Sequence, residues 1–99
     1  MGLSQNLQEK TMTVRRDKMM IIADILLALQ SKHLKFTHLL YKSNLSHARL
    51  KEYLDELMQK QLVVELQTKE GKRYAITDDG AKFYAEYRRV NEFVKSFGL

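Results

Sequence analysis

The sequence predicts a mainly α-helical domain with one small β-hairpin, followed by a last helix. From Met20 to Met58 apolar residues recur at three- and four-residue spacing, the period of amphipathic helices. After Gln61 the period falls to two around a glycine-bearing turn, which is typical of paired strands. At 99 residues and 44% hydrophobic content, the chain has apolar material for one small core. We therefore expect a single domain with the order helix, helix, helix, hairpin, helix.

The amino-terminal residues 1–14 are polar and show no hydrophobic period, so we expect a flexible arm there. A folded domain is expected over residues 15–80, and a carboxy-terminal helix that packs on it over residues 81–99. The side chain of Asp17 is expected to cap the first helix, which ends near Lys32. The apolar positions of this helix are Met20, Ile21, Ile25, Ala28 and Leu29.

A short second helix is expected to begin with Thr37 as its cap and to run through Lys42. It should bury Leu39 or Leu40 together with Tyr41. We interpret Tyr41 as a core ring with its hydroxyl at the surface rather than as a residue that stacks on bases.

The residues from Ser43 to Ser46 break the helical period and predict a tight turn. Asn44 tolerates the left-handed conformation, Leu45 provides an inward anchor, and Ser46 can cap the next helix. This third helix should run from about His47 to Lys60. Its buried face is expected to contain Leu50, Tyr53, Leu54, Leu57 and Met58.

The period-two segment predicts a strand over 62–67, a turn over 69–72 and a returning strand over 73–76. Gly71 can supply positive φ in the turn. Thr77 is followed by Asp78 and Asp79, which favours capping of a last helix that runs to about Phe97. Three helices with a short turn between the second and third, followed by a hairpin, are typical of a winged helix-turn-helix.

The net positive charge is concentrated in the stretch that ends the predicted first helix, contains the second and begins the third. No acid occurs between Asp24 and Glu52, whereas five basic residues and all three histidines do, and the other 12 basic and 12 acidic residues cancel. A neutral domain with one cationic helical hairpin is expected to dock that hairpin on a polyanion. The five basic residues are Lys32, Lys35, Lys42, Arg49 and Lys51.

An α-helix fits the major groove of B-form DNA, and its outward residues meet the base edges. We expect His47, Lys51 and Glu52 to face bases, and the other candidates to contact the backbone or, from the hairpin, the minor groove. The predicted DNA-binding residues are Thr37, Lys42, Ser46, His47, Arg49, Lys51, Glu52, Lys69, Lys72 and Arg73.

The sequence resembles the archaeal winged-helix DNA-binding proteins of the Sac-ten-a type over roughly residues 18–94. The resemblance rests on the run from Thr37 to Ser46 and on residues of the later elements. It implies a dimeric, cytoplasmic, nucleoid-associated protein that binds double-stranded DNA, as an architectural protein or as a transcription regulator. The later residues are Leu50, Tyr53, Leu54, Leu57, Tyr74, Thr77, Gly80 and Phe83.

The same resemblance implies a homodimer formed by an antiparallel coiled coil of carboxy-terminal helices. Apolar residues in the last helix recur at the a/d spacing of such a seam, although the seam is shorter than in relatives with several heptads. Phe83 and Tyr84 are also expected to belong to the core of the domain. The predicted dimer interface consists of Tyr87, Val90, Val94 and Phe97.

No catalytic signal is present, and we expect a binding protein with no cofactor and no small-molecule substrate. The chain has no cysteine, and the spacing of His33, His38 and His47 matches no recurring metal-ligand pattern. No segment of the sequence is apolar enough to suggest a membrane protein or a signal peptide. The alternative is a winged helix that binds a protein partner, because the acids Glu52 and Asp55 and their neighbour Glu56 would repel phosphates.

Overall fold

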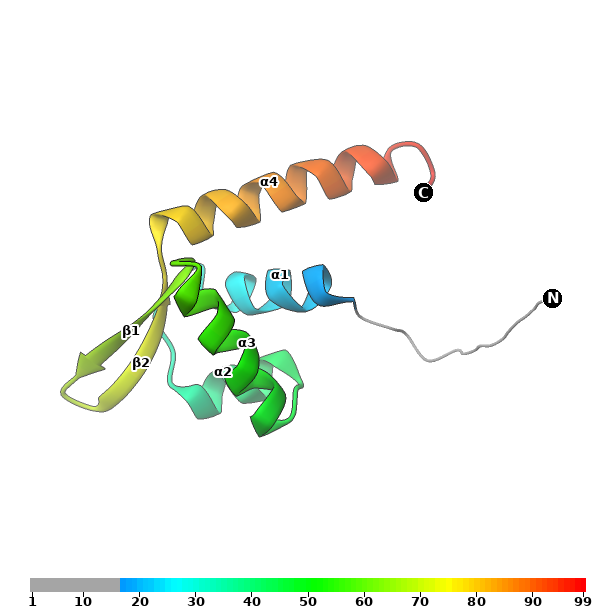
Figure 1. Ribbon diagram of the computed structural model, residues 1–99. Helices are drawn as coiled ribbons and strands as arrows, with labels where there is room; N and C mark the ends of the chain where they lie inside the picture. The colour runs from blue at the N-terminus through cyan, green and yellow to red at the C-terminus, as the bar shows by residue number, and fades with distance from the viewer. Residues whose placement is uncertain (1–16) are drawn as a thin grey trace.

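The computed structural model describes residues 17–99, so the arm predicted over 1–14 lies outside the described residues. Four helices and a two-stranded antiparallel sheet confirm the predicted fold class (Figure 1). Among the described helices, none combines the length and the apolar content needed to cross a membrane. The elements are α1 (Lys18–Ala28), α2 (Phe36–Ser43), α3 (His47–Gln59), β1 (Val63–Thr68), β2 (Gly71–Ile76) and α4 (Asp78–Lys95).

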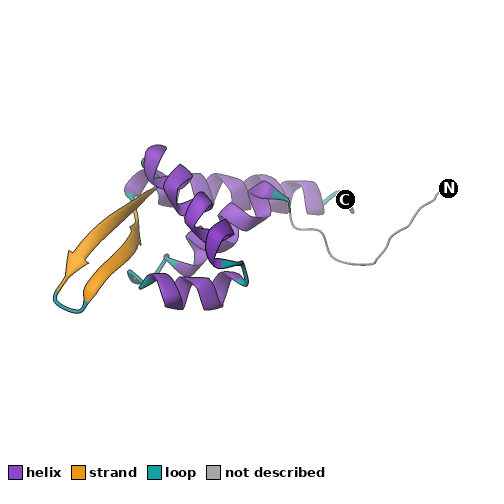
Figure 2. Ribbon diagram, turned by 60° about the horizontal axis from the view of Figure 1, so that its bottom comes forward, coloured by secondary structure: helices purple, strands orange, loops and turns teal. Residues whose placement is uncertain are grey.

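The core lies where α1, α2 and α3 meet. In Figure 1, α4 runs along α1 on one side, α2 and α3 lie on the other side, and the hairpin projects from the helices. Figure 2 shows the same projection of the hairpin from a second direction. Burial of each large aliphatic side chain in this core contributes about 1.5–3 kcal/mol to the stability of the fold. The side chains with almost no exposure are Ile25, Leu26, Leu29, Leu39, Leu50, Leu54 and Leu57.

The start of α1 is predicted correctly and its end is not. The Oδ1 atom of Asp17 accepts a hydrogen bond of 2.8 Å from the Met20 amide, which confirms the cap. The helix ends at Ala28, four residues before the predicted Lys32. The chain must extend again before α2, because Leu34 pairs with a residue of β2 as an isolated bridge.

The same bridge explains why the prediction of Thr37 as a cap is wrong. Lys35 next to it is extended, with φ −72° and ψ 158°, and it occupies the cap position without a side-chain hydrogen bond. Thr37 therefore lies inside the first turn of α2. The prediction of a buried Tyr41 is also wrong, since its side chain is 86% exposed. Leu39 takes the inner position, and a residue two places further along a helix points to the other side.

The turn and the third helix follow the prediction. Asn44 has φ 56° and ψ 42°, the left-handed conformation expected of it. The Oγ atom of Ser46 accepts a hydrogen bond of 3.2 Å from the Arg49 amide and caps α3. Tyr53 and Met58 are half-buried against the fully buried leucines of α3. This agreement arises because caps and left-handed turns are set by local residues.

The end of α3 contains a feature that the sequence does not announce. Gln61 has φ 64°, and its amide donates to the Met58 carbonyl at 3.0 Å, while the Leu62 amide donates to the Leu57 carbonyl at 2.9 Å. These two bonds form a Schellman motif, a helix ending that usually has glycine at the left-handed position. The motif turns the chain directly into β1.

The hairpin is tighter than predicted, because strand pairing already begins where Thr68 faces Gly71, leaving Lys69 and Glu70 as the turn. Gly71 has φ 111°, as expected for a turn glycine. Successive residues of a strand point to opposite faces. Lys72 therefore shares one face with the buried Tyr74, while Arg73 between them points to the other face.

The last helix is anchored at its first turn. The hydroxyl of Thr77 accepts from the Gly80 amide at 2.9 Å and donates to the Gln61 carbonyl at 2.8 Å, which confirms the predicted cap. The helix ends at Lys95, two residues before the predicted Phe97. Gly80 is the only residue of α4 that is fully buried.

We predict that Gly80→Ala destabilises the fold, although alanine normally favours a helix over glycine. A Cβ atom at position 80 would collide with the Leu62 carbonyl oxygen and lie 2.8 Å from the Ile76 Cγ1 atom. Such overpacking costs about 1–3 kcal/mol. Urea unfolding followed by circular dichroism measures this, with exposed Ala85→Ser as a control of little effect. An unchanged free energy of unfolding would contradict the prediction.

Candidate nucleic-acid interface

Seven of the ten residues predicted to bind DNA lie on the surface formed by α2, the turn and the start of α3, which we call the recognition surface. The helices place them outward because the opposite face of α2 and α3 carries the buried leucines. In Figure 1, α2 and the amino-terminal end of α3 lie on the side of the molecule away from α4. Exposed side chains on this surface are Thr37, Lys42, Ser46, His47, Arg49, Lys51 and Glu52.

The cations of this surface differ in their partners. Within residues 17–99, Lys42 and Arg49 form no ion pair. Lys51 lies 3.9 Å from Asp55 along α3, with both side chains about 60% exposed. An exposed pair at this distance contributes about 0–1 kcal/mol. A phosphate can therefore replace the carboxylate at little cost.

The Arg49 side chain is held against α3 by an aromatic ring. Its guanidinium carbon lies 5.7 Å from the centre of the Tyr53 ring, within the range of a cation–π contact. Tyr53 itself packs against the core, as predicted for this ring. The contact limits the motion of Arg49 without neutralising its charge.

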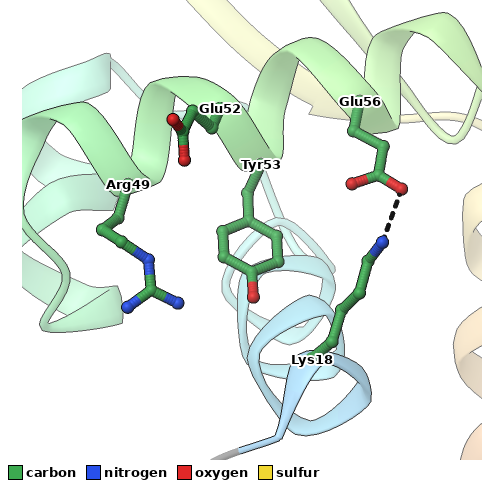
Figure 3. Close-up of a pocket in the computed structure, with 5 residues that line it drawn as sticks. All are labelled: Lys18, Arg49, Glu52, Tyr53 and Glu56. Carbon is green, nitrogen blue, oxygen red and sulfur yellow. Dashed lines mark hydrogen bonds and ion pairs between the residues drawn. The ribbon is translucent and has the colours of Figure 1, made fainter.

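Beyond Tyr53, an ion pair joins the start of α1 to α3. Figure 3 shows Lys18 reaching Glu56, at 2.9 Å from Nζ to Oε2, on the far side of a cavity of about 210 Å³ from Arg49. The hydrogen bond and the charge of Glu56 raise the pKa of Lys18 from its ordinary value, which stabilises the ammonium form.

The hairpin brings one of its cations beside α3. A groove of about 350 Å³ lies between the recognition surface and β2, and Lys72 lines it together with His47 and Lys51. Lys72 also lies 3.9 Å from Glu65 of the neighbouring strand. Lys69 is exposed at the hairpin turn and forms no ion pair within the described residues.

Arg73 does not lie beside α3. It lies on the opposite face of the hairpin, half-buried, with one guanidinium nitrogen 3.4 Å from Glu70. Its Nε atom is buried and has no hydrogen-bond partner within the described residues. The structure therefore groups Lys72 with the recognition surface and separates Arg73 from it.

Phe36 is a residue of this site that the sequence prediction missed. Its ring centre lies 4.6 Å from that of His47, at the first position of α3, and it lines the groove beside Lys72. No local pattern marks it, because its role depends on how α2 and α3 meet.

The predicted dimer residues divide into two groups. Tyr87 is half-buried and lines a shallow cavity between α1 and α4. Val90, Val94 and Phe97 are exposed by 50%, 38% and 68%, respectively. Phe93 is 63% exposed and contacts Phe97 with ring centres 5.1 Å apart. The spacing 90, 93, 94, 97 is a helical apolar stripe, and this signal could have identified Phe93.

The three histidines were considered above as metal ligands. Within the part of the chain that the structure describes, no three His, Cys, Asp or Glu side chains are grouped as they would be around a metal ion.

Comparison with protein families matches residues 15–95 to the winged helix-turn-helix family. This chain belongs to the winged helix-turn-helix family. A search of curated protein sequences finds no match.

Several solved structures resemble this fold. Sso10a-2, a DNA-binding protein from Sulfolobus solfataricus, is 23% identical with a TM-score of 0.66, and the match covers 84% of this chain and 90% of that one. The transcriptional regulator BldR from the same organism is 17% identical with a TM-score of 0.70, over 78% and 58% of the two chains. The adhesin competence repressor of Streptococcus pyogenes is 16% identical with a TM-score of 0.65, over 79% and 60%. This chain thus spans less than two thirds of the two regulators, and at these identities the likeness shows the fold.

Proposed function

We propose that this winged helix-turn-helix protein binds double-stranded DNA without catalysing a reaction, as a transcription regulator or a nucleoid-associated protein in the cytoplasm. The amino-terminal half of α3 would enter the major groove, and the hairpin would lie on the backbone as the wing. The observation that carries this proposal is the exposed surface of α2 and α3, where Lys42 and Arg49 have no acidic partner within the described residues. Two of the similar structures are those of a DNA-binding protein and a transcriptional regulator, which supports it.

The proposed contacts follow from charge and position. Lys42 and Arg49 would bind phosphates, and Lys51 and Lys72 would exchange their loose carboxylate partners for phosphates. The hydroxyls of Thr37 and Ser46 and the ammonium of Lys69 would add backbone contacts. His47, Lys51 and Glu52 remain as the candidates for base contacts.

The positions of the acids on α3 favour an arrangement in which only the amino-terminal half of this helix enters the DNA groove, rather than binding to a protein partner. Glu56 is paired with Lys18 on the side of α1, and Asp55 lies near Lys51. Glu52 is then the one acid of the three without an ion pair within residues 17–99. These acids therefore give little support to the alternative that the winged helix binds a protein partner.

We predict that Lys42→Gln weakens binding to a random-sequence duplex of about 30 base pairs and lowers the salt dependence. Loss of one phosphate contact should reduce the slope of log K against log salt by about 0.9. Fluorescence anisotropy at several salt concentrations measures this slope.

The matched control for Lys42 is Lys82→Gln, which removes one exposed positive charge from α4 on the other side of the molecule. Equal slopes for both variants would mean that net charge alone matters. If the unaltered protein binds no duplex at low salt, the DNA proposal is wrong and a protein partner becomes the better explanation.

The two faces of the hairpin lead to a second prediction. Lys72→Gln should lower the salt slope by about 0.9, whereas Arg73→Gln should leave it unchanged, because Arg73 points away from α3. The same anisotropy titration measures the salt slope of each variant. A loss of slope for Arg73→Gln as well would show that the hairpin contacts DNA with both faces.

We also propose that α4 forms a homodimer through its exposed apolar stripe, which we define as Val90, Phe93, Val94 and Phe97. Val90, Phe93 and Val94 lie on the last two turns of α4 and Phe97 follows its end, whereas the residues of α4 that pack on the core, Phe83 and Tyr84, lie near its start. The 18 residues of α4 give a helix of about 27 Å, and only its second half carries the stripe. Tyr87 would lie at the edge of this interface rather than at its centre.

We predict that Val90→Glu produces a monomer that keeps its fold. A charge in the centre of an apolar seam is left buried without a partner, which separates coiled-coil helices. Sedimentation equilibrium measures the mass, and circular dichroism checks helix content.

The control for Val90 is Ala85→Glu, which places the same charge on the opposite face of α4 and should leave the mass unchanged. A monomeric unaltered protein, or loss of helix in Val90→Glu, would contradict the proposed interface.

A further inference from the structure

His47 is exposed at the start of α3, and its ring contacts another aromatic ring. It is the first residue of α3, and its ring centre lies 4.6 Å from that of Phe36 with the planes inclined by 48°. The first residues of a recognition helix are those that reach base edges. A fixed ring at this position loses little freedom on binding, so its contact can discriminate between bases.

Phe36 can hold the imidazole because Phe36 is itself fixed. It packs against the core, and its ring centre lies 6.4 Å from that of Tyr74. Tyr74 in turn exchanges two backbone hydrogen bonds with Leu34, of 3.0 and 2.8 Å. Three aromatic rings therefore connect the core of the domain to the tip of the recognition helix.

The polar atoms at this position are mainly donors. Within residues 17–99 neither ring nitrogen of His47 has a hydrogen-bond partner, so an imidazole N–H is available in either protonation state. Lys51 follows one helical turn later on the same side and lines the same groove. The carboxylate nearest to this pair is Asp55, 3.9 Å from the Lys51 ammonium.

We propose that Phe36 is a positioning residue that orients His47 to donate a hydrogen bond to N7 of a guanine in the major groove, with Lys51 donating to O6 of the same guanine. Guanine presents two acceptors there, whereas adenine replaces the second acceptor with a donor, which would face the Lys51 ammonium. A G·C pair is therefore preferred at this position. This proposal rests on the proposed function, because it assumes that α3 enters the major groove.

The test uses guanine analogues in a duplex selected by the full-length protein from a random-sequence pool. Each guanine is replaced in turn by 7-deazaguanine, which lacks the N7 acceptor and still pairs with cytosine. At one guanine position in each binding site, replacement by 7-deazaguanine should weaken binding about tenfold. His47→Ala should lose about the same factor on the unmodified duplex and show no further loss on the modified one.

The role of Phe36 is tested by the ratio of affinities for the two duplexes, which is independent of the fraction of protein that is folded. Phe36→Leu should reduce this ratio from about ten to about three or less while leaving the salt slope unchanged. Phe36→Tyr retains an aromatic ring, so it should keep the ratio near ten. Tyr41→Leu is the matched control, because Tyr41 is an exposed ring of the same helix that does not contact His47.

The outcomes separate the two proposals. Salt-dependent duplex binding without sequence selection, or with no effect of any 7-deazaguanine, would overturn the guanine contact and leave DNA binding in place. If His47→Ala still binds the 7-deazaguanine duplex about tenfold more weakly than the unmodified one, the guanine contact would also be overturned. An unchanged ratio in Phe36→Leu would overturn the positioning role. Absence of duplex binding at low salt would overturn both proposals.

Discussion

The pairing of Tyr74 with Leu34 is the interaction on which the shape of the recognition surface depends. Its two backbone hydrogen bonds join β2 to the segment between α1 and α2, 40 residues earlier in the chain. Both side chains are buried, so water does not compete for these bonds. Because Tyr74 sits on β2, the same contact also fixes where the hairpin leaves the body. The orientation of α2 and that of the hairpin are therefore set together.

The division of α4 into two parts follows from the small size of the core. The first turn is held by Thr77 and Gly80, and Phe83 and Tyr84 half-bury their rings against the core formed mainly by α1, α2 and α3. From Glu92 onward every residue of the chain is exposed. The apolar stripe on the last turns of α4 is thus left in water, and an exposed apolar patch of this kind usually marks an interaction site. Hydrogen bonds and ion pairs of Arg88 with Glu92 and of Arg89 with Glu86 raise the pKa of both arginines and leave them charged on the exposed surface of the helix.

The features that the sequence predicts correctly are those determined by nearby residues. The caps at Asp17, Ser46 and Thr77 and the left-handed Asn44 each depend on a side chain and the amides within three residues of it. The errors arise from contacts between distant residues. The end of α1 and the start of α2 are displaced by the pairing of Leu34 with β2, and Tyr41 is exposed because Leu39 takes the inner side of α2. The end of α3 agrees with the predicted Lys60 to within one residue, but the Schellman motif there was not predicted, since Gln61 adopts a conformation that glycine usually signals.

The candidate site shows the same dependence on distance along the chain. Composition reveals the acid-free stretch, and helical spacing reveals which of its residues point outward. Neither shows that Lys72 and Arg73, adjacent in sequence, lie on opposite faces of the hairpin relative to α3, because that depends on strand register. The ring contact between Phe36 and His47 likewise joins two helices across a turn, and no periodicity within either helix indicates it.

The distribution of charge along α3 limits how such a helix can approach DNA. Its first turn combines the positive end of the helix dipole with Arg49, and Lys42 at the end of α2 lies just before the turn that leads into it. One turn later come Glu52 and Asp55, whose charges would be repelled by phosphates on either side of the groove. The electrostatic attraction therefore acts on the amino-terminal end of α3, and the rest of the helix is held away from the backbone. A helix that enters end-on presents few residues to the bases, so the orientation of each one, His47 above all, counts for more in discrimination than it would in a helix lying along the groove.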